Sequence, residues 1–594
     1  MDTDTARFAP LVGKSYSRRS MMKLVGGTLS VPILSSLIAA CGGSKNGSTA
    51  TTTGENVAAT SVSGQPTPLD TFKNAGSPTA TTASVASPTA ASTSAASGQP
   101  KKGGTIHQSN INDPDTLDPA LSSSIVSSLI FQYIYDGLVF IGEDHVPHPW
   151  LAQKWDISAD GKQISFTIQT GVKFHDGTAL DGAAVKASFD RVLDPSIASI
   201  RKTGMGPVTG IDLVDPQTVR FNFSAPYAPL FTNLESNGVV SPAALQKYGD
   251  KFGHNPVGTG PFMFKEWATG QSVSLVRYED YIQFRDDYKN KGPAYLDGLM
   301  WKVIGDPATS NAALLSGELD IAGVDLTQAS TVQNNPDFKV YIWKDRDGFI
   351  FVEYNMNKPP FDDLALRKAI AYSMDRENMV KSAYNGFATA NLLPIPNGVA
   401  GWDKTLEQYA YPFDLDKAKQ VLTDGGYTQA SDGTMQKDGK PVEFTMLVYS
   451  GNAPLKTDSQ IIQASLQQIG IKCDIKVLDF SAELPQLNSG DFECDIMRWT
   501  SPDPNILSLM FKTPGWRKQM NDSQLDALCT TADTTIDPTK RLDAVHAVVK
   551  YLLDQAIVAP IVTDWSLWAV HQYVKDYSLT VFGNARMADV WLDK

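Results

Sequence analysis

Polar and apolar residues alternate along several short segments in the middle of the chain. Such alternation is typical of half-buried strands, whereas apolar residues three and four positions apart indicate amphipathic helices. The alternating pattern predicts strands over 105–109, 163–169, 218–223, 262–267, 273–278 and 299–304. The helical spacing predicts helices over 122–136, 182–192 and 307–316. This part of the chain therefore combines strands, including one hairpin, with helices.

After residue 348 strands and helices follow one another more regularly. The predicted strands are 349–354, 442–449, 471–477 and 494–499. The predicted helices are 363–373, 376–384, 414–424, 455–469, 480–489, 521–533 and 538–554. Regular alternation of this kind predicts a mostly parallel sheet that is covered by helices.

Residues 42–102 show neither pattern. They consist almost entirely of Ser, Thr, Ala, Gly and Pro, and Phe72 is the one aromatic residue between 44 and 100. Such a segment buries too little apolar surface to offset the entropy of ordering it, so we expect a disordered tether. A flexible coil of this length spans roughly 40 Å root-mean-square.

The first 41 residues have the layout of an export signal. Arg18 and Arg19 precede a short apolar run from Leu24 to Leu37, and small residues lead to Cys41. The run is too short, and too broken by glycine and proline, for a transmembrane helix. The segment resembles a twin-arginine signal joined to a bacterial lipoprotein cleavage box. That resemblance implies export, lipidation of Cys41 and attachment to the outer face of the cytoplasmic membrane.

Composition narrows the possible functions. Residues 103–594 are too many for one core, so two or three lobes are expected. The formal net charge is −13, and no Lys/Arg run follows Lys102, which argues against a nucleic-acid partner. No phosphate loop, zinc-protease helix motif or Gly-x-Ser-x-Gly elbow occurs, so we expect no enzyme activity. No cofactor is indicated.

Three cysteines remain beside Cys41. Cys473, Cys494 and Cys529 have neither the spacing of a disulfide framework nor that of a zinc site. Buried free thiols are the first interpretation, and one Cys473–Cys494 disulfide between neighbouring strands is the second.

Five groups of short motifs occur in order across residues 103–594. They are Leu151–Trp155 with Gly171–Gly177, Asn255–Phe262, Leu315–Asp320, Tyr354–Arg376, and Tyr411–Tyr427. In this order they resemble the extracytoplasmic solute-binding proteins of peptide/nickel-type ABC importers (family 5, oligopeptide- and dipeptide-binding-protein-like). The motifs themselves are turns, helix starts and tight crossings, so they indicate the fold and not ligand contacts.

The resemblance implies an α/β fold of the periplasmic-binding-protein type (class II, cluster C), with two lobes, an extra subdomain and a hinge. The first lobe would combine 103–143, 257–347 and 565–594. The subdomain would be 144–256, and the second lobe 348–564. Strand crossings near 345–350 and 562–567 would form the hinge, which closes on ligand.

The resemblance implies a monomeric protein that captures a solute and delivers it to a membrane permease. An oligopeptide or dipeptide is the first expectation for that solute. The alternatives are a non-peptide solute (oligosaccharide, nickel or another metal complex, or haem) and a sensor subunit. Glu143, Asp144, His145 and His148 could ligate a metal, although two histidines in a proline-containing loop more often belong to a solvated surface.

Relatives that bind peptides pair the α-amino group with an aspartate shortly after a tryptophan. Here Trp499 is followed by Asp503 and Asn505, in a segment that looks shorter. Either Asp503 takes that role or the ligand lacks a free amine. Trp499 is the best candidate for packing against ligand, with a core tryptophan as the alternative. Weaker candidates from cleft-facing loops are Trp402, Tyr384, Ser122 and Ser123.

Overall fold

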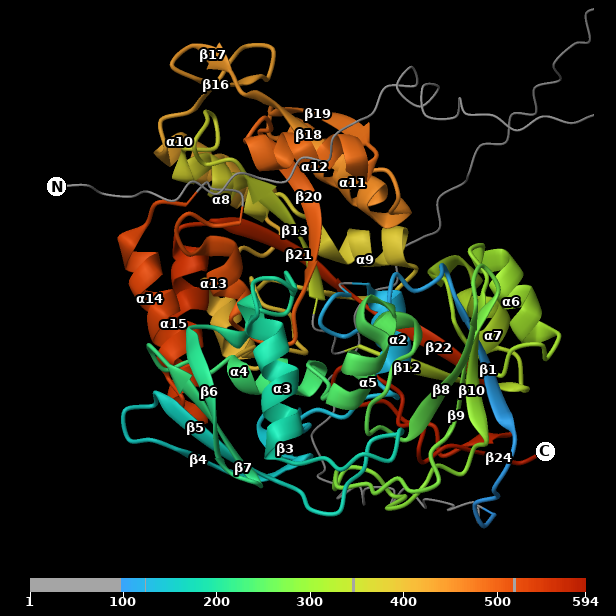
Figure 1. Ribbon diagram of the computed structural model, residues 1–594. Helices are drawn as coiled ribbons and strands as arrows, with labels where there is room; N and C mark the ends of the chain where they lie inside the picture. The colour runs from blue at the N-terminus through green and yellow to red at the C-terminus, as the bar shows by residue number, and fades with distance from the viewer. Residues whose placement is uncertain (1–97, 123, 345–347, 517–519) are drawn as a thin grey trace, which may run out of the picture. The chain divides into compact units, whose positions relative to one another are not determined.

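The computed structural model describes residues 98–594 apart from 123, 345–347 and 517–519 (Figure 1). The predictions for Arg18, Arg19, Cys41, Ser123 and most of the tether lie outside the described residues. Within them, no helix is long and apolar enough to span a bilayer.

A mixed sheet organises the first lobe. In the part of the chain that the structure describes it has seven strands, in the order β12 (Phe338–Trp343), β22 (Ser566–His571), β11 (Ile321–Gly323), β1 (Thr105–Asn110), β10 (Gly298–Val303), β9 (Ser272–Arg277) and β8 (Phe262–Ala268). Its helices are α2 (Ile125–Phe131), α5 (Pro242–Tyr248), α6 (Pro307–Leu315) and α7 (Ala329–Gln333). The predicted hairpin is confirmed as β8 and β9. The predicted helix over 122–136 is shorter and begins after the N-cap Ser124.

The second lobe contains the strands β14 (Ala388–Ala390), β21 (Val558–Asp564), β13 (Gly348–Tyr354), β20 (Cys494–Thr500), β18 (Glu443–Tyr449) and β19 (Lys472–Leu478), in that order. The prediction of a mostly parallel sheet is wrong. β18 runs parallel to β19 and β20, but β13 is antiparallel to both of its neighbours, β20 and β21.

Helices cover both faces of this sheet. They are α8 (Leu364–Tyr372), α9 (Arg376–Tyr384), α10 (Leu415–Asp424), α11 (Ala453–Gln468), α12 (Phe480–Ser489), α13 (Ile506–Phe511), α14 (Ser523–Thr534) and α15 (Pro538–Asp554). Every residue of β13 is buried, because alternate side chains enter two different cores. Ile350 and Val352 pack on the side of α8 and α9, whereas Phe349 and Phe351 pack on the side of α13 and α15.

A four-stranded antiparallel sheet forms the subdomain among the described residues. Its strands are β4 (Ala152–Ile157), β5 (Gln163–Ile168), β7 (Thr218–Phe223) and β6 (Val208–Asp215), and its helices are α3 (Gly182–Leu193) and α4 (Leu230–Ser236). Helix α3 packs on β6 and β7. The polar–apolar alternation predicted β5 and β7 correctly.

Shorter elements connect these layers. The small strands are β2 (Val139–Ile141), β3 (Pro147–Pro149), β15 (Thr428–Gln429), β16 (Met435–Lys437), β17 (Lys440–Pro441), β23 (Val574–Lys575) and β24 (Trp591–Leu592). The 3₁₀ turns are η1 (Thr203–Met205), η2 (Gly249–His254), η3 (Leu326–Gln328) and η4 (Lys404–Tyr409).

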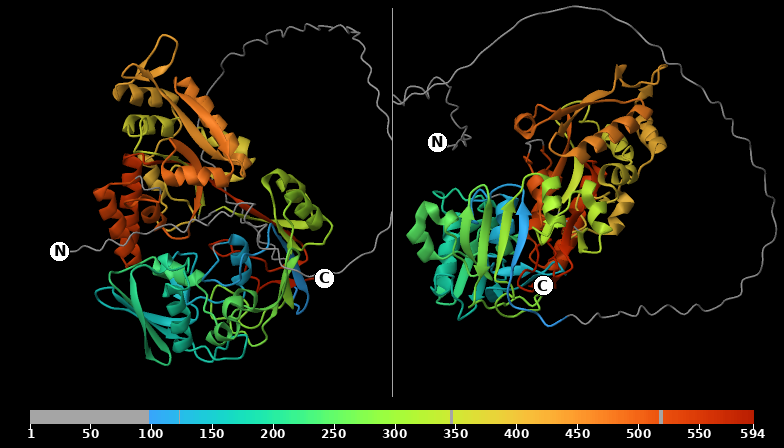
Figure 2. Two further views of the ribbon diagram at one scale, coloured as in Figure 1. Left: turned by 45° about the horizontal axis from the view of Figure 1, so that its top comes forward. Right: turned by 90° about the vertical axis from the view of Figure 1, so that its right-hand side faces the viewer.

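The chain passes between the two larger sheets where β12 is followed by β13 and where β21 is followed by β22. In the left view of Figure 2 the orange part of the chain, which holds β18, β19 and β20, lies apart from the blue and green strands. The predicted limits of the lobes and the subdomain stay a prediction. At two places the packing differs from them: β2 packs in the subdomain core, and α5 packs in the core of the first lobe.

Residues from two of the ordered motifs have the structural roles predicted for those motifs. A Cβ atom on Gly258 would lie 2.2 Å from the Ile134 carbonyl oxygen, so the chain can cross there only without a side chain. Asp363 caps α8 by accepting a hydrogen bond from the Ala365 N–H.

Cys473, Cys494 and Cys529 are buried free thiols, as the first interpretation predicted. Cys473 lies on β19 and Cys494 on β20, and β18 runs between these two strands, so the alternative disulfide is wrong.

Candidate ligand-binding cavity

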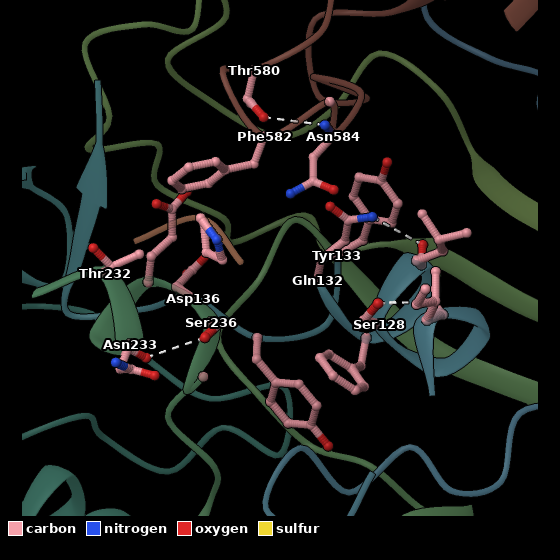
Figure 3. Close-up of a pocket in the computed structure, with 18 of the residues that line it drawn as sticks. Ser128, Gln132, Tyr133, Asp136, Thr232, Asn233, Ser236, Thr580, Phe582 and Asn584 are labelled. Carbon is pink, nitrogen blue, oxygen red and sulfur yellow. Dashed lines mark hydrogen bonds between the residues drawn. The ribbon is translucent and has the colours of Figure 1, made fainter. Parts of the chain in front are cut away.

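A cavity of about 660 Å³ lies among the first lobe, the subdomain and the segment that follows β20. Small-molecule sites typically occupy roughly 300–1,000 Å³ and favour the junctions of domains. Figure 3 shows Gln132 and Ser128 on one side of this space, Thr232, Asn233 and Ser236 on another, and Phe582 and Asn584 on a third. Segments far apart in the sequence therefore build one site.

Aromatic side chains form much of the cavity wall. They are Phe131, Tyr133, Tyr135, Trp150, Tyr227, Tyr281, Tyr288, Trp343, Trp568 and Phe582. Flat rings bury a large area with few rotatable bonds, and their faces pack against many kinds of solute. The wall therefore favours an organic ligand with apolar or planar parts.

Several polar groups of the wall hydrogen-bond to nearby protein atoms. The Ser128 hydroxyl donates to the Ile125 carbonyl at 2.7 Å, and the Gln132 amide donates to the Leu129 carbonyl at 3.2 Å. On α4, the Ser236 hydroxyl donates to the Asn233 carbonyl at 3.3 Å (Figure 3). Each of these side chains therefore lines the cavity while one of its hydrogen bonds goes to the protein.

Two carboxyl groups of the wall are buried. Asp136 accepts hydrogen bonds from the Thr259 and Tyr281 hydroxyls at 2.9 and 3.4 Å. Glu235 accepts one from the Ile141 N–H at 2.9 Å. Burial raises the pKa of Asp136 to about 7 and the pKa of Glu235 to about 7, because water no longer stabilises the charged forms. Both groups change charge near neutral pH.

Arg285 is a buried cation that the protein itself neutralises. Its guanidinium donates two hydrogen bonds to Asp287, at 3.0 and 2.9 Å, and lies 3.7 Å from Glu235. The same group stacks over the rings of Phe140 and Trp150, 4.3 and 4.8 Å from their centroids. These contacts hold the guanidinium in place and neutralise its charge, so little of that charge is left for a ligand.

Asp503 reaches the cavity wall but is bound tightly by protein groups. It is 4% exposed, and the Arg541 guanidinium donates to its two oxygens at 3.0 and 2.5 Å. The hydroxyl of Thr232, on α4, donates to the same carboxylate at 2.8 Å. Burial acts to raise the pKa of Asp503, but Arg541 and the other donors hold it below its ordinary value. The carboxylate thus joins the subdomain to the second lobe.

Of the other predicted site residues, Asn505 lines the cavity and lies 3.5 Å from the Tyr227 hydroxyl. Trp499 and Trp402 pack at the edge of a second-lobe core, where Trp499 meets Trp516 edge to face at 4.3 Å. These two tryptophans are not among the lining residues.

Tyr384 and Ser122 are also absent from the lining residues. Tyr384 is buried and donates to Asp458 at 2.7 Å. Ser122 is buried and donates to Asp115 at 2.6 Å. Ligand contact by Trp499, Trp402, Tyr384 or Ser122 stays a prediction.

The loop around 143–148, considered above as a metal site, has a simple pair of side chains. His148 lies 3.0 Å from an oxygen of Asp144, and its ring stacks on Phe140 at 5.2 Å. Within residues 98–594, gaps excepted, no three His, Cys, Asp or Glu side chains gather as metal ligands would.

Sequence reasoning missed much of the wall. Arg201, Glu235, Thr232 and Phe582 line the cavity from loops and from one short helix, and none belongs to a recognisable motif. The signal that could have pointed to them is weak: polar or aromatic residues near turns, in segments without periodicity.

Residues 146–518 match the family described as bacterial extracellular solute-binding proteins, family 5 (middle region). The chain belongs to this family. The structure of the chain has the fold of this family, in which lobes enclose a solute site. Members of the family are extracytoplasmic proteins that pass small solutes to the permeases of ABC importers.

Two similar relatives are glutathione-binding proteins GsiB. The protein from Pectobacterium atrosepticum is 29% identical over 61% of this chain and 67% of its own length. The protein from Salmonella paratyphi A is 29% identical over 72% of this chain and 82% of its own length.

Solved structures show the same fold. The substrate-binding protein CtaP of Listeria monocytogenes has a TM-score of 0.74 at 21% identity, over 83% of this chain and 100% of its own. DppA of Helicobacter pylori, in complex with the peptide STSA, has a TM-score of 0.67 at 25% identity, over 83% and 99%. AgaA of A. tumefaciens R10, in complex with agropinic acid, has a TM-score of 0.66 at 25% identity, over 83% and 99%.

Proposed function

We propose that this protein binds short peptides outside the cytoplasm and delivers them to an ABC-type permease. The observation that carries the proposal is the aromatic-walled cavity between the lobes of a family 5 fold. Relatives named for glutathione and a neighbour solved with a tetrapeptide support a peptide ligand. In this proposal Asn505 contacts the ligand, while Asp503 joins the subdomain to the second lobe.

Capture would use a hinge at the two strand crossings predicted from the sequence, near 345–350 and 562–567. Ligand that touches both sides of the cavity would favour the closed form, because it binds that form better than the open one. A permease would recognise the closed form. The protein would act as a monomer, without a resident cofactor.

The export signal and the tether complete the proposal. After export through Arg18 and Arg19, lipid on Cys41 would attach the protein to the outer face of the membrane. Each buried lipid methylene contributes about 0.8 kcal/mol, so two or three acyl chains hold firmly. Mass analysis of the exported protein would show acyl groups at Cys41, and Cys41→Ala would release the protein from membranes.

A non-peptide organic acid is the second candidate ligand. The specific observation in its favour is that Asp503, the group expected to pair with a peptide amine, is already neutralised by Arg541. AgaA, with agropinic acid, shows the same fold.

A thermal-melt screen tests the proposal. The ligands are reduced glutathione, the dipeptide Met-Leu, the tetrapeptide Ser-Thr-Ser-Ala, agropinic acid, maltotriose and Ni²⁺ with L-histidine. A ligand at a hundred times its Kd stabilises the folded state by about 2.7 kcal/mol, which raises the melting temperature by several degrees. Stabilisation by peptides is expected. Stabilisation by maltotriose or nickel alone would reject the peptide proposal.

A further inference from the structure

Arg201 differs from the other charged side chains of the cavity wall. Among the described residues those charged groups are Asp136, Arg201, Glu235, Arg285 and Asp503. Arg285 and Asp503 are each paired with an opposite charge, and the two carboxyl groups with raised pKa values are partly neutral near pH 7. Arg201 forms no ion pair with any described residue, and burial lowers its pKa without an opposing carboxylate.

The protein holds the guanidinium of Arg201 in place through neutral groups. Nε donates to the Pro119 carbonyl at 3.2 Å, and Nη2 donates to the Ser122 carbonyl at 3.3 Å. These carbonyls orient the group but carry no full negative charge. Nη1 donates to no atom of the described residues, so part of the planar fork is available on the cavity side.

The loop that carries those carbonyls is itself fixed. Asp118 accepts two hydrogen bonds from the Arg191 guanidinium, at 3.0 and 2.5 Å. The Ser199 hydroxyl donates to the Ala120 carbonyl at 2.7 Å, which ties the segment before Arg201 to the same loop. The guanidinium therefore sits on a rigid support, as a binding group should.

A half-buried cation with no counter-ion is costly unless something supplies the opposite charge. An arginine fork matches a carboxylate, with which it can form two parallel, charge-assisted hydrogen bonds. We infer that Arg201 binds a carboxylate of the ligand, so that the cavity selects solutes with a free acid group. The inference rests on the proposed function for the nature of that solute, a peptide whose free C-terminal carboxylate would face Arg201.

The test compares each acid with its amide on the unchanged protein. Isothermal titration of the full chain would measure the Kd of Met-Leu, of Ser-Thr-Ser-Ala and of their C-terminal amides, with agropinic acid and maltotriose as further ligands. Loss of a hydrogen-bonded charge pair weakens binding about 10- to 100-fold. The amides should therefore bind about 10- to 100-fold more weakly than the acids.

Variants locate the effect. Arg201→Gln should weaken binding of the acids to the level of the amides and leave binding of the amides unchanged. Arg201→Lys should restore part of the loss, because it keeps the charge but not the fork. The matched control is Arg220→Gln: Arg220 also belongs to the subdomain, pairs with Asp212 at 2.9 Å and does not line the cavity. Circular dichroism would confirm that each variant folds.

The outcomes separate this inference from the proposed function. Equal Kd values for acids and amides would overturn the carboxylate site and leave the peptide proposal standing. Binding of agropinic acid that depends on Arg201, without peptide binding, would support the site and reject the peptide proposal. If maltotriose is the only ligand that binds, or if none of the acids binds, both the carboxylate site and the peptide proposal are overturned.

Discussion

The pairing of Asp503 with Arg541 predicts that Asp503 serves structure and not the ligand amine. Arg541 does not line the cavity, so Arg541→Gln tests the pair without touching the ligand space. The substitution would leave a carboxylate that is 4% exposed without its cation. Removing one partner of a buried pair costs about 3–5 kcal/mol, because the remaining charge is uncompensated. Stability should fall by that amount.

The opposite substitution completes a double-mutant cycle. Asp503→Asn should also destabilise, because it leaves the Arg541 guanidinium buried beside a neutral amide. The double variant should cost less than the sum of the two single variants, since neither member of the pair is left charged without the other. Thr232→Val removes only the hydrogen bond from α4, so about 1 kcal/mol is expected.

Urea unfolding, followed by tryptophan fluorescence, would give the stabilities, and titration with a peptide that binds would give the affinities. The reasoning would be refuted if Arg541→Gln unfolded at the wild-type urea concentration while Asp503→Asn stayed stable and lost peptide binding. That combination would assign Asp503 to the ligand amine.

Three further predictions concern burial. Burial raises the pKa of Asp458 from 3.8 to about 7 in the folded protein. The folded state therefore binds this proton more tightly than the unfolded state does. The resulting gain in the free energy of unfolding is fully present below about pH 4 and is lost as the pH rises through about 7. Asp458→Asn should raise stability at pH 8 by up to roughly 4 kcal/mol and flatten the pH profile of the melting temperature; parallel profiles would contradict this. Gly258→Ala should destabilise by about 1–3 kcal/mol or more in urea unfolding, because its Cβ would meet the Ile134 carbonyl, whereas Gly210→Ala, with open space at that position, should not. The three buried thiols should react with Ellman's reagent only after unfolding, since burial raises the pKa of Cys473 to about 12; fast reaction of the native protein would disprove their burial.

Local patterns along the chain predicted most of the individual elements. The alternation over 163–169 and 218–223 corresponds to β5 and β7, and the helical spacing over 182–192 corresponds to α3. Such patterns report which face of a segment is buried, and that property belongs to the segment itself. The ordered motifs predicted, in addition, the family and its two-lobed fold.

Those patterns did not predict whether neighbouring strands run parallel or antiparallel. β13 is buried on both faces, which suits a parallel or an antiparallel neighbour equally well. Its partners β20 and β21 come from distant parts of the chain, so only the folded structure could decide that both run antiparallel to it.

The cavity, too, was predicted only in part from the sequence. Of the described residues to which the sequence by itself pointed, Asp503 and Asn505 lie in the wall, whereas Trp499, Trp402, Tyr384 and Ser122 do not line it. Only the tertiary structure brought Arg541 to Asp503, and it left Arg201 on the wall without an opposite charge. The reason is physical: the charge that a side chain presents to a ligand depends on which partners already satisfy it, and those partners are set by packing between segments that are remote in sequence.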